Sequence, residues 1–268
     1  MLDPIAYTLA RKSAGHGPLI LMYHSVSSDQ QPDWPWAVSL RRFCQQLDLL
    51  SSLGYRTATM SDVTTGKVSA MDGPLVVITF DDGYEDNLLA VEALARRGMT
   101  ATWFIVSGAI GGEPHWPYDG RPAGRIMNAA ALRDMNATGI EIGSHTVSHC
   151  RLTEASDVDL VLELTDSKAA LEDILSNEIS SFAYPYGDWD ARCADAVQAV
   201  GYRQACTTRT GWALHDGNPY TLRRLTVYSH DTVSTFCRKL VLAHNDGSFW
   251  TLARYFRTRL FESIQNSL

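Results

Sequence analysis

The alternation of short apolar runs with stretches of helical spacing limits the fold of this chain more than any other feature. Apolar runs, many of them rich in β-branched residues, occupy residues 19–23, 75–80, 101–106, 140–142, 180–184, 202–206 and 220–227. Apolar side chains recur at helical intervals over residues 40–53, 87–97, 129–137, 158–175 and 191–200. Strands that alternate with helices pair in parallel. About seven such units fit the chain, and they favour an α/β fold of the (β/α) barrel type over a doubly wound sheet.

Glycines mark the ends of four of the expected helices. Gly54, Gly98, Gly139 and Gly201 each stand where a stretch of helical spacing stops. The residue after a helix often adopts the left-handed conformation, which glycine reaches without a steric penalty. We therefore expect four helices to end at these positions.

The length of 268 residues suits one barrel-sized domain. We expect an N-terminal extension over residues 1–17, the barrel over residues 18–230, and two helices over residues 231–268 that pack on the barrel. The last helix combines apolar and basic side chains, namely Phe249, Trp250, Leu252, Tyr255, Phe256, Leu260 and Phe261 with Arg254, Arg257 and Arg259. Two interpretations stay open: its aromatic face packs on the barrel, or the helix makes a peripheral membrane contact near a lipid-linked substrate.

Charge and composition exclude some classes of partner. The net charge of -7 argues against nucleic acid, because a phosphate-binding surface needs a basic excess. No stretch approaches the roughly 20 apolar residues of a membrane span, and residues 1–13 lack the apolar run of a secretory signal. The five cysteines are scattered, as expected for reduced thiols. Together these features predict a cytoplasmic protein without a transmembrane segment.

Two adjacent carboxylates follow the apolar run at residues 75–80, in the sequence Asp81-Asp82-Gly83. Side chains at the carboxyl ends of parallel strands face the ligand crevice. Neighbouring residues of an extended strand point to opposite sides, so both acids reach one centre only if the chain bends, and Gly83 permits that bend. The alternative is a plain turn or a helix cap.

Two histidines at i and i+4, His145 and His149, follow the run at residues 140–142. On one turn of helix this spacing places both imidazoles on the same face, where they can hold a divalent metal. One carboxylate and two imidazoles leave coordination positions open, as in a catalytic rather than a structural site. Zinc is the default metal for these ligands, with cobalt, nickel and iron as alternatives.

A rigid turn follows the run at residues 180–184. Pro185 and Gly187 fix the backbone on either side of Tyr186, which suits presentation of a main-chain N–H to a developing oxyanion. An ordinary strand-to-loop turn is the alternative.

These segments occur in one order in a known family. Residues 79–83 (Thr-Phe-Asp-Asp-Gly), 145–149 (His-Thr-Val-Ser-His) and 184–187 (Tyr-Pro-Tyr-Gly) resemble motifs of the polysaccharide deacetylases with a NodB-like domain, carbohydrate esterase family 4. The resemblance covers roughly residues 18 to 230 and implies a distorted (β/α) barrel. It implies that Asp81 is the general base, that Asp82, His145 and His149 bind the metal, and that the Tyr186 N–H is an oxyanion donor.

Three departures from the family pattern affect the expected site. The arginine that usually opens the third motif is missing from residues 181–183, and the usual Asp…Asp-Trp motif is missing near residues 207–212. Arg224 is our candidate to orient Asp81 instead, with a surface salt bridge as the alternative. The C-terminal Leu-x-His is also absent, but Met22 and His24 end the first strand. This arrangement resembles the permuted family members, in which Met22 would line the acetyl pocket and His24 would be the general acid.

The expected reaction is hydrolysis of an N-acetyl group on an amino sugar in a polysaccharide, an oligosaccharide or a glycan precursor. The metal would polarise the carbonyl and lower the pKa of its bound water, the nucleophile. Asp81 would take the water proton, and His24 would protonate the departing amine. Two alternatives stay open: a metal-dependent hydrolase of a small non-glycan amide, and a non-catalytic carbohydrate-binding relative.

Aromatic side chains in the loops are candidates for a platform under the sugar ring. They are Trp34, Trp36, Trp116, Tyr118 and Trp189. Simple packing against the barrel is the alternative for each of them.

Overall fold

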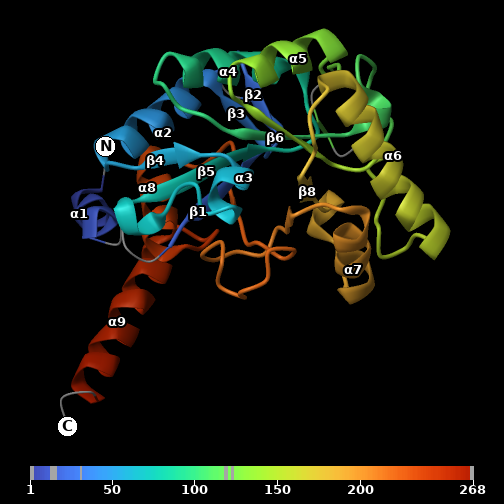
Figure 1. The fold of residues 1–268 in the computed structure, drawn as a ribbon. Coiled ribbons are helices and arrows are strands. Elements are labelled where there is room, and N and C mark those ends of the chain that lie inside the picture. The colour runs from blue at the N-terminus through green and yellow to red at the C-terminus, as the bar shows by residue number, and fades with distance from the viewer. Residues whose placement is uncertain (1–2, 13–16, 31, 118–119, 122–123, 266–268) are drawn as a thin grey trace.

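A curled parallel sheet forms the centre of the computed structural model, which describes residues 3–12, 17–30, 32–117, 120–121 and 124–265 (Figure 1). Within those residues, seven strands follow one another in the order β10-β1-β5-β6-β7-β8-β9, and β4 pairs with β5 beside this path. Every pairing is parallel. The predicted distorted (β/α) barrel with about seven parallel strands is confirmed. The strands are β1 (Leu19–Tyr23), β4 (Arg56–Ala58), β5 (Leu75–Phe80), β6 (Thr102–Ile105), β7 (Glu141–Ser144), β8 (Ser181–Ala183), β9 (Gln204–Cys206) and β10 (Leu225–Thr226).

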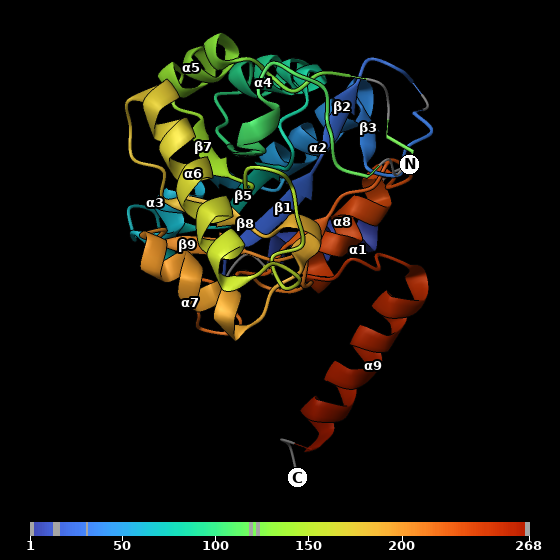
Figure 2. The same cartoon turned by 90° about the vertical axis from the view of Figure 1, so that its right-hand side faces the viewer.

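Helices surround the sheet and connect its strands (Figures 1 and 2). They are α1 (Pro4–Lys12), α2 (Leu40–Ser52), α3 (Met60–Thr64), α4 (Leu88–Ala95), α5 (Ala129–Ala137), α6 (Asp157–Leu175), α7 (Ala191–Val200), α8 (Val233–Leu242) and α9 (Phe249–Gln265). Short 3₁₀ turns lie at η1 (Ala70–Asp72), η2 (Glu85–Asn87), η3 (Ser107–Ala109) and η4 (Pro185–Gly187). Two short strands, β2 (Ser25–Ser27) and β3 (Ala37–Ser39), form a separate parallel pair.

The end of the sheet returns to its beginning through residues 222–226. Leu222 forms a bridge with Cys206 of β9, and the Thr207 N–H donates to the Leu222 carbonyl at 2.9 Å. Three residues later, Leu225 pairs with Leu21 of β1. The sequence predicted a strand over residues 220–227, but regular pairing is limited to β10 because the chain changes partner from β9 to β1 within this segment.

The glycine positions predicted the helix ends. Gly54, Gly98, Gly139 and Gly201 have φ values of 76°, 61°, 88° and 96°, all in the left-handed region. A β-carbon is disfavoured there, so these residues stop α2, α4, α5 and α7.

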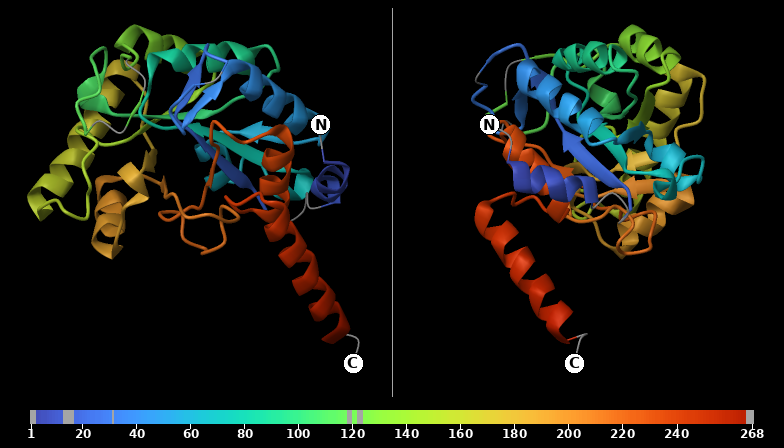
Figure 3. Two further views of the ribbon diagram at one scale, coloured as in Figure 1. Left: turned by 180° about the vertical axis from the view of Figure 1, so that it is seen from behind. Right: turned by 90° about the vertical axis from the view of Figure 1, so that its left-hand side faces the viewer.

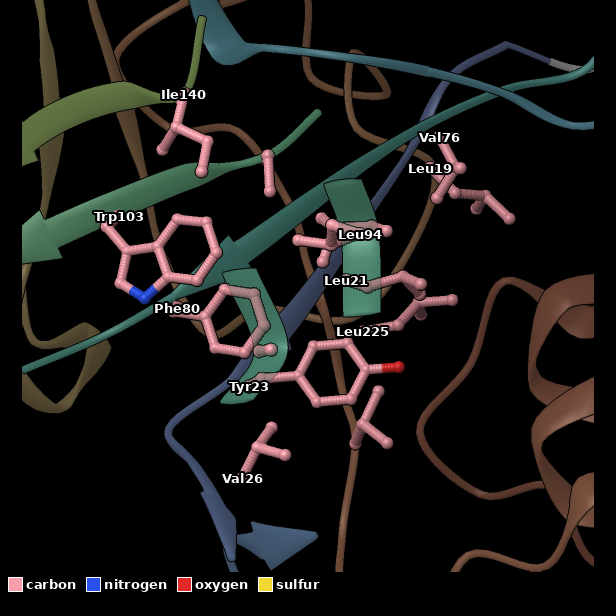
Figure 4. Packing of buried hydrophobic residues seen from close by; sticks show 14 of the residues in the cluster. Leu19, Leu21, Tyr23, Val26, Val76, Phe80, Leu94, Trp103, Ile140 and Leu225 are labelled. Atoms are coloured by element: carbon pink, nitrogen blue, oxygen red, sulfur yellow. The ribbon is translucent and has the colours of Figure 1, made fainter. Parts of the chain in front are cut away.

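Alternate residues of the strands serve two different cores. Leu19, Leu21 and Tyr23 of β1 belong to the large cluster between the sheet and the helices, which we call the outer core (Figure 4). Ile20 belongs to a smaller cluster in the barrel interior with Val77, Phe104, Ala183 and Cys206 of four other strands and with Leu222, which precedes β10. The strands are therefore buried on both faces, as in other all-parallel sheets. The same alternation turns Met22 toward the interior.

The C-terminal helices differ in how they contact the barrel. α8 packs against α1 and α2, whereas α9 extends away from the body of the molecule (Figures 1 and 3). Among the side chains of the predicted aromatic face whose burial is described, Leu252 is buried, whereas Phe249 is 63% and Trp250 84% exposed. No helix in the described part of the chain is long and apolar enough to cross a membrane. The division at residues 17 and 230 and a peripheral membrane contact stay predictions.

Loss of a central aromatic ring should weaken the outer core. Trp103 is fully buried and stacks on Phe80 with a centroid distance of 4.1 Å, and Phe80 in turn stacks on Tyr23 at 5.3 Å (Figure 4). We expect Trp103→Ala to lower the free energy of unfolding by about 3–5 kcal/mol in denaturant titrations. The control is Leu162→Ala on α6, where the side chain is 47% exposed and the expected change is within about 0.5 kcal/mol. Equal losses in the two variants would contradict this account of the core.

Candidate active site

The candidate residues gather where the strands end. Asp81 and Asp82 follow β5, His145 follows β7, and Tyr186 follows β8. His24 follows β1, and Arg224 stands directly before β10, the neighbour of β1. Segments far apart along the chain therefore meet at one end of the barrel, as expected for a ligand site in a parallel α/β fold.

A sharp turn brings the two carboxylates to the same side. Asp81 still continues the sheet, since its N–H donates to the Tyr23 carbonyl at 2.9 Å. Asp82 then adopts a φ of 73°, and the Gly83 N–H donates back to the Asp81 carbonyl at 2.9 Å. The predicted bend is present, and it is centred on Asp82 as well as on Gly83, whose φ is 90°.

His145 and His149 lie in an irregular loop. The predicted turn of helix is wrong, because Thr146 and His149 have φ values of 68° and 60°, which a right-handed helix does not allow. The Thr146 hydroxyl instead accepts a hydrogen bond from the His149 N–H at 2.9 Å. The two rings nevertheless converge, with centroids 4.9 Å apart.

Residues with left-handed backbone are concentrated at the end of the barrel where the site lies. Six non-glycine residues of the described chain have positive φ, and four of them, Asp82, Thr146, His149 and Tyr186, lie here. Such residues cost about 1–3 kcal/mol each and persist only where the surrounding contacts hold them. The backbone shape of this site therefore lowers the stability of the folded chain.

Asp82, His145 and His149 form a buried cluster that fits a divalent metal. One ligand atom from each residue lies within 4.8 Å of the others. Asp82 Oδ1 is 3.2 Å from His149 Nε2 and 3.5 Å from His145 Nε2, yet it has no hydrogen bond of proper geometry among the described residues. A buried carboxylate oxygen without a donor is costly unless a cation is bound to it.

The protonation state of His145 also fits a metal ligand. Its Nδ1 lies 2.8 Å from the Ala183 carbonyl, so Nδ1 carries the proton and the Nε2 lone pair faces Asp82. Burial of the ring, together with the neighbouring His149, lowers the pKa of His145 to about 4. The imidazole is therefore neutral near pH 7 and able to bind a cation.

Arg224 contacts Asp81 through two hydrogen bonds. Its Nη1 donates to Asp81 Oδ1 at 2.7 Å and its Nη2 to Oδ2 at 2.8 Å, and both side chains are buried. Arg224 also donates to the Thr207 carbonyl and to the Thr79 hydroxyl. Burial opposes ionisation of Asp81, but the Arg224 guanidinium and the neighbouring His145 and His24 together lower the pKa of this carboxyl below its ordinary value. The alternative of a surface salt bridge is wrong for Arg224, since its side chain is fully buried.

A cavity of about 310 Å³ opens above these groups. The side chains that line it are Met22, His24, Trp34, Trp36, Asp81, Asp82, Trp116, Pro117, His145, His149, Tyr186 and Thr208. The rings of His24, Trp34 and Trp36 pack against one another, with centroid distances of 5.9 Å for His24–Trp34, 6.0 Å for His24–Trp36 and 5.6 Å for Trp34–Trp36. The buried Nδ1 of His24 has no hydrogen-bond partner among the described residues. Every site residue predicted from the sequence except Arg224 lines this cavity, and Arg224 lies behind Asp81.

Three of the predicted platform aromatics lie at the cavity. Trp34, Trp36 and Trp116 line it, and Trp116 stacks on His149 with a centroid distance of 4.7 Å. Trp189 instead packs on Tyr184 beside the outer core, because its loop runs toward α7. Tyr118 lies outside the described residues.

The turn at Tyr186 is fixed by close packing. Tyr186 has a φ of 60°, and its ring lies 4.6 Å from that of His149. A β-carbon on Gly187 would lie 2.1 Å from the Thr208 hydroxyl oxygen, so only glycine fits there. Thr208 therefore supports the turn from the loop after β9, a contact that no motif in the sequence predicts.

Removal of one imidazole should abolish metal binding. We expect the wild-type chain to bind one divalent ion and His149→Ala to bind none, because a carboxylate and a single imidazole hold a metal weakly. Elemental analysis after gel filtration measures the bound metal. His230→Ala, which removes an exposed histidine stacked on Tyr228, is the control and should retain the metal. Metal retained by His149→Ala would refute this ligand set.

Removal of Arg224 should leave a buried carboxylate without its cation. We expect Arg224→Met to lower the free energy of unfolding at neutral pH by about 3–5 kcal/mol. The control is Arg223→Met, which breaks the more exposed ion pair with Asp216 and should cost no more than about 1 kcal/mol. Denaturant titration of both variants measures the difference. Similar values would mean that the buried pair is not the stronger constraint.

Comparison with known proteins identifies the family of the chain. A family model described as polysaccharide deacetylase matches residues 69–205. YxkH of Bacillus subtilis (strain 168), named for polysaccharide deacetylase activity, is 30% identical over 211 residues, which cover 78% of this chain and 70% of YxkH. A chitin deacetylase of a Pestalotiopsis species is 29% identical over 129 residues, covering 47% of this chain and 38% of that enzyme.

Solved structures share the fold at lower sequence identity. IcaB from Ammonifex degensii superposes with a TM-score of 0.72 at 24% identity, covering 85% of this chain and 97% of IcaB. The Streptococcus pyogenes deacetylase PplD, solved in complex with acetate, gives a TM-score of 0.69 at 23% identity, covering 80% of this chain and 94% of PplD. The family match and the similarity to YxkH, together with the barrel, show that the chain belongs to the polysaccharide deacetylase family.

Proposed function

We propose that this chain hydrolyses the N-acetyl group of an amino-sugar unit in a polysaccharide, an oligosaccharide or a glycan precursor, and that the reaction needs a divalent metal. The observation that carries the proposal is the buried cluster of Asp82, His145 and His149 beside a second carboxylate, Asp81, that Arg224 holds. A carbohydrate-binding protein has no need of this second, oriented carboxylate. The membership of the chain in a deacetylase family supports the same reaction.

The metal would be held by Asp82, His145 and His149, with zinc as the proposed ion. When bound, it supplies Lewis acidity that polarises the acetyl carbonyl and acidifies water. The side chains transfer protons and orient the reacting groups. Asp81 accepts the proton of the attacking water, and Arg224 fixes the direction of its carboxylate.

His24 is the proposed general acid. It follows β1, packs against Trp34 and Trp36, and lines the same cavity as the three proposed metal ligands. A protonated imidazole there can donate a proton to the departing sugar nitrogen. The Tyr186 N–H, in the turn after β8, is the proposed donor to the oxyanion.

The cavity walls favour a sugar ring as the group that carries the acetyl amide. Trp34, Trp36 and Trp116 form part of the cavity wall, and aromatic rings bury apolar surface in a defined geometry. Met22 forms part of the cavity wall and is suited to contact an acetyl methyl group. The cavity is at the small end of the range for ligand sites, so a small non-glycan amide is the second candidate substrate.

Loss of the proposed base should separate metal binding from turnover. We expect Asp81→Asn to keep its metal but to lose about 10²–10⁴-fold in kcat, because the amide cannot accept the water proton. Acetate release from N-acetylglucosamine oligomers measures turnover, and elemental analysis measures the metal. Normal turnover by Asp81→Asn would show that another group is the base. Asp216→Asn, on the exposed pair with Arg223, is the control and should keep both properties.

Chelation distinguishes the candidate functions. We expect dialysis against a chelator to abolish acetate release and added zinc to restore it. Release that persists without metal would contradict the metal centre. Turnover of small acetamides but not of oligomers would favour the second candidate, and bound metal without any acetate release would favour a non-catalytic binder.

A further inference from the structure

The loop that carries both histidine ligands is held in an unusual shape by groups outside the ligand set. Within residues 145–149 the backbone is left-handed at Thr146 and again at His149. Neither residue is a glycine, so this shape is unfavourable for the isolated segment. Contacts from other parts of the chain must therefore determine where the His149 imidazole lies.

A side chain from α6 supplies one set of these contacts. Glu163 Oε2 accepts hydrogen bonds from the Val147 N–H at 2.8 Å and the Ser148 N–H at 2.9 Å. Its Oε1 accepts from the Ser148 hydroxyl at 2.6 Å. One carboxylate thus takes three donors from two consecutive residues, which lie between the two histidines.

The opposite side of the loop rests on main chain. The Ser107 N–H donates to the Thr146 carbonyl and the Gly108 N–H to the Val147 carbonyl, both at 3.0 Å. A β-carbon at Gly108 would lie 2.6 Å from the Val147 carbonyl oxygen, so this approach requires glycine. The peptide at Val147 is therefore held between η3 on one side and Glu163 on the other.

We propose that Glu163 is a positioning residue for the metal centre, and that its carboxylate sets metal affinity by fixing the loop between His145 and His149. The inference rests on the proposed metal site but not on the proposed substrate. Hydrogen bonds that charged carboxylates accept are among the stronger ones, and groups that orient metal ligands contribute strongly to affinity. Glu163 itself is not part of the ligand cluster and lines a surface groove beside α6.

The rival explanation is purely electrostatic. Glu163 shares its groove with Glu154, Asp159 and Asp166, and any of these carboxylates attracts a nearby cation. Asp166 is a suitable comparison, because it lies about one turn further along α6 and its carboxylate accepts a hydrogen bond from the Thr165 hydroxyl of the same helix. Replacing either acid by its amide removes one negative charge, but only the change at Glu163 disturbs the loop.

The experiment compares metal affinity in Glu163→Gln, Glu163→Ala and Asp166→Asn with that of the wild-type chain. Competition with a chromophoric chelator measures the zinc dissociation constant, and the visible spectrum of bound cobalt(II) reports the ligand geometry. We expect Glu163→Ala to weaken zinc binding about 10–100-fold and to alter the cobalt spectrum. Glu163→Gln should lie between Glu163→Ala and wild type, because its amide oxygen still accepts, while Asp166→Asn should match wild type.

Thermal unfolding of the metal-free proteins checks that each variant is folded, and Glu163→Gln serves if Glu163→Ala does not fold. Wild-type affinity and an unchanged cobalt spectrum in a folded Glu163 variant would overturn the inference. Equal weakening by Asp166→Asn would overturn it in favour of the electrostatic explanation. A wild-type chain that binds no metal would overturn it together with the metal centre, whereas metal binding without acetate release would refute only the proposed reaction.

Discussion

The buried ion pair between Arg224 and Asp81 is the interaction on which the site and the closure of the sheet both depend. Arg224 belongs to the segment that passes from β9 to β1, and Asp81 ends β5 on the other side of β1. A guanidinium that makes two hydrogen bonds to one carboxylate fixes the relative position of both backbones. A buried charge without its partner is strongly destabilising. Correct closure of the barrel and correct orientation of the carboxylate therefore occur together.

The strand between the ligands has a comparable role. β6 lies between β5 and β7 in the sheet and contributes no ligand of its own. Its last residue, Ile105, accepts a hydrogen bond from the His145 N–H, and the next N–H, that of Val106, donates to the Asp82 carbonyl. The spacing between the Asp82 and His145 backbones is therefore set by the sheet, whereas the position of His149 depends on the loop.

Features that repeat along the chain could be predicted from the sequence, and features that depend on a single distant contact could not. The order of strands and helices follows from hydrophobic periodicity, and the helix ends follow from Gly54, Gly98, Gly139 and Gly201. The search for a missing arginine identified Arg224. The loop between the histidines was misassigned as helical, because nothing local shows that Thr146 will be left-handed. Glu163 was missed since, in sequence, it resembles any other acid of a surface helix. The short strands β2, β3 and β4, with the sequences Ser-Val-Ser, Ala-Val-Ser and Arg-Thr-Ala, were missed because none of them forms an apolar run.

The left-handed residues around the active site affect how readily its loops open when no metal ion is bound. Asp82, Thr146, His149 and Tyr186 keep an unfavourable backbone only through their neighbours, whereas the glycines that end the helices carry no such burden. Local opening should therefore begin in the loops that carry these four residues, while the stacked rings of the outer core stay packed. An ion bound by the closed form opposes that opening by mass action. Binding of one metal ion would therefore determine how often the loops around the site adopt the closed form.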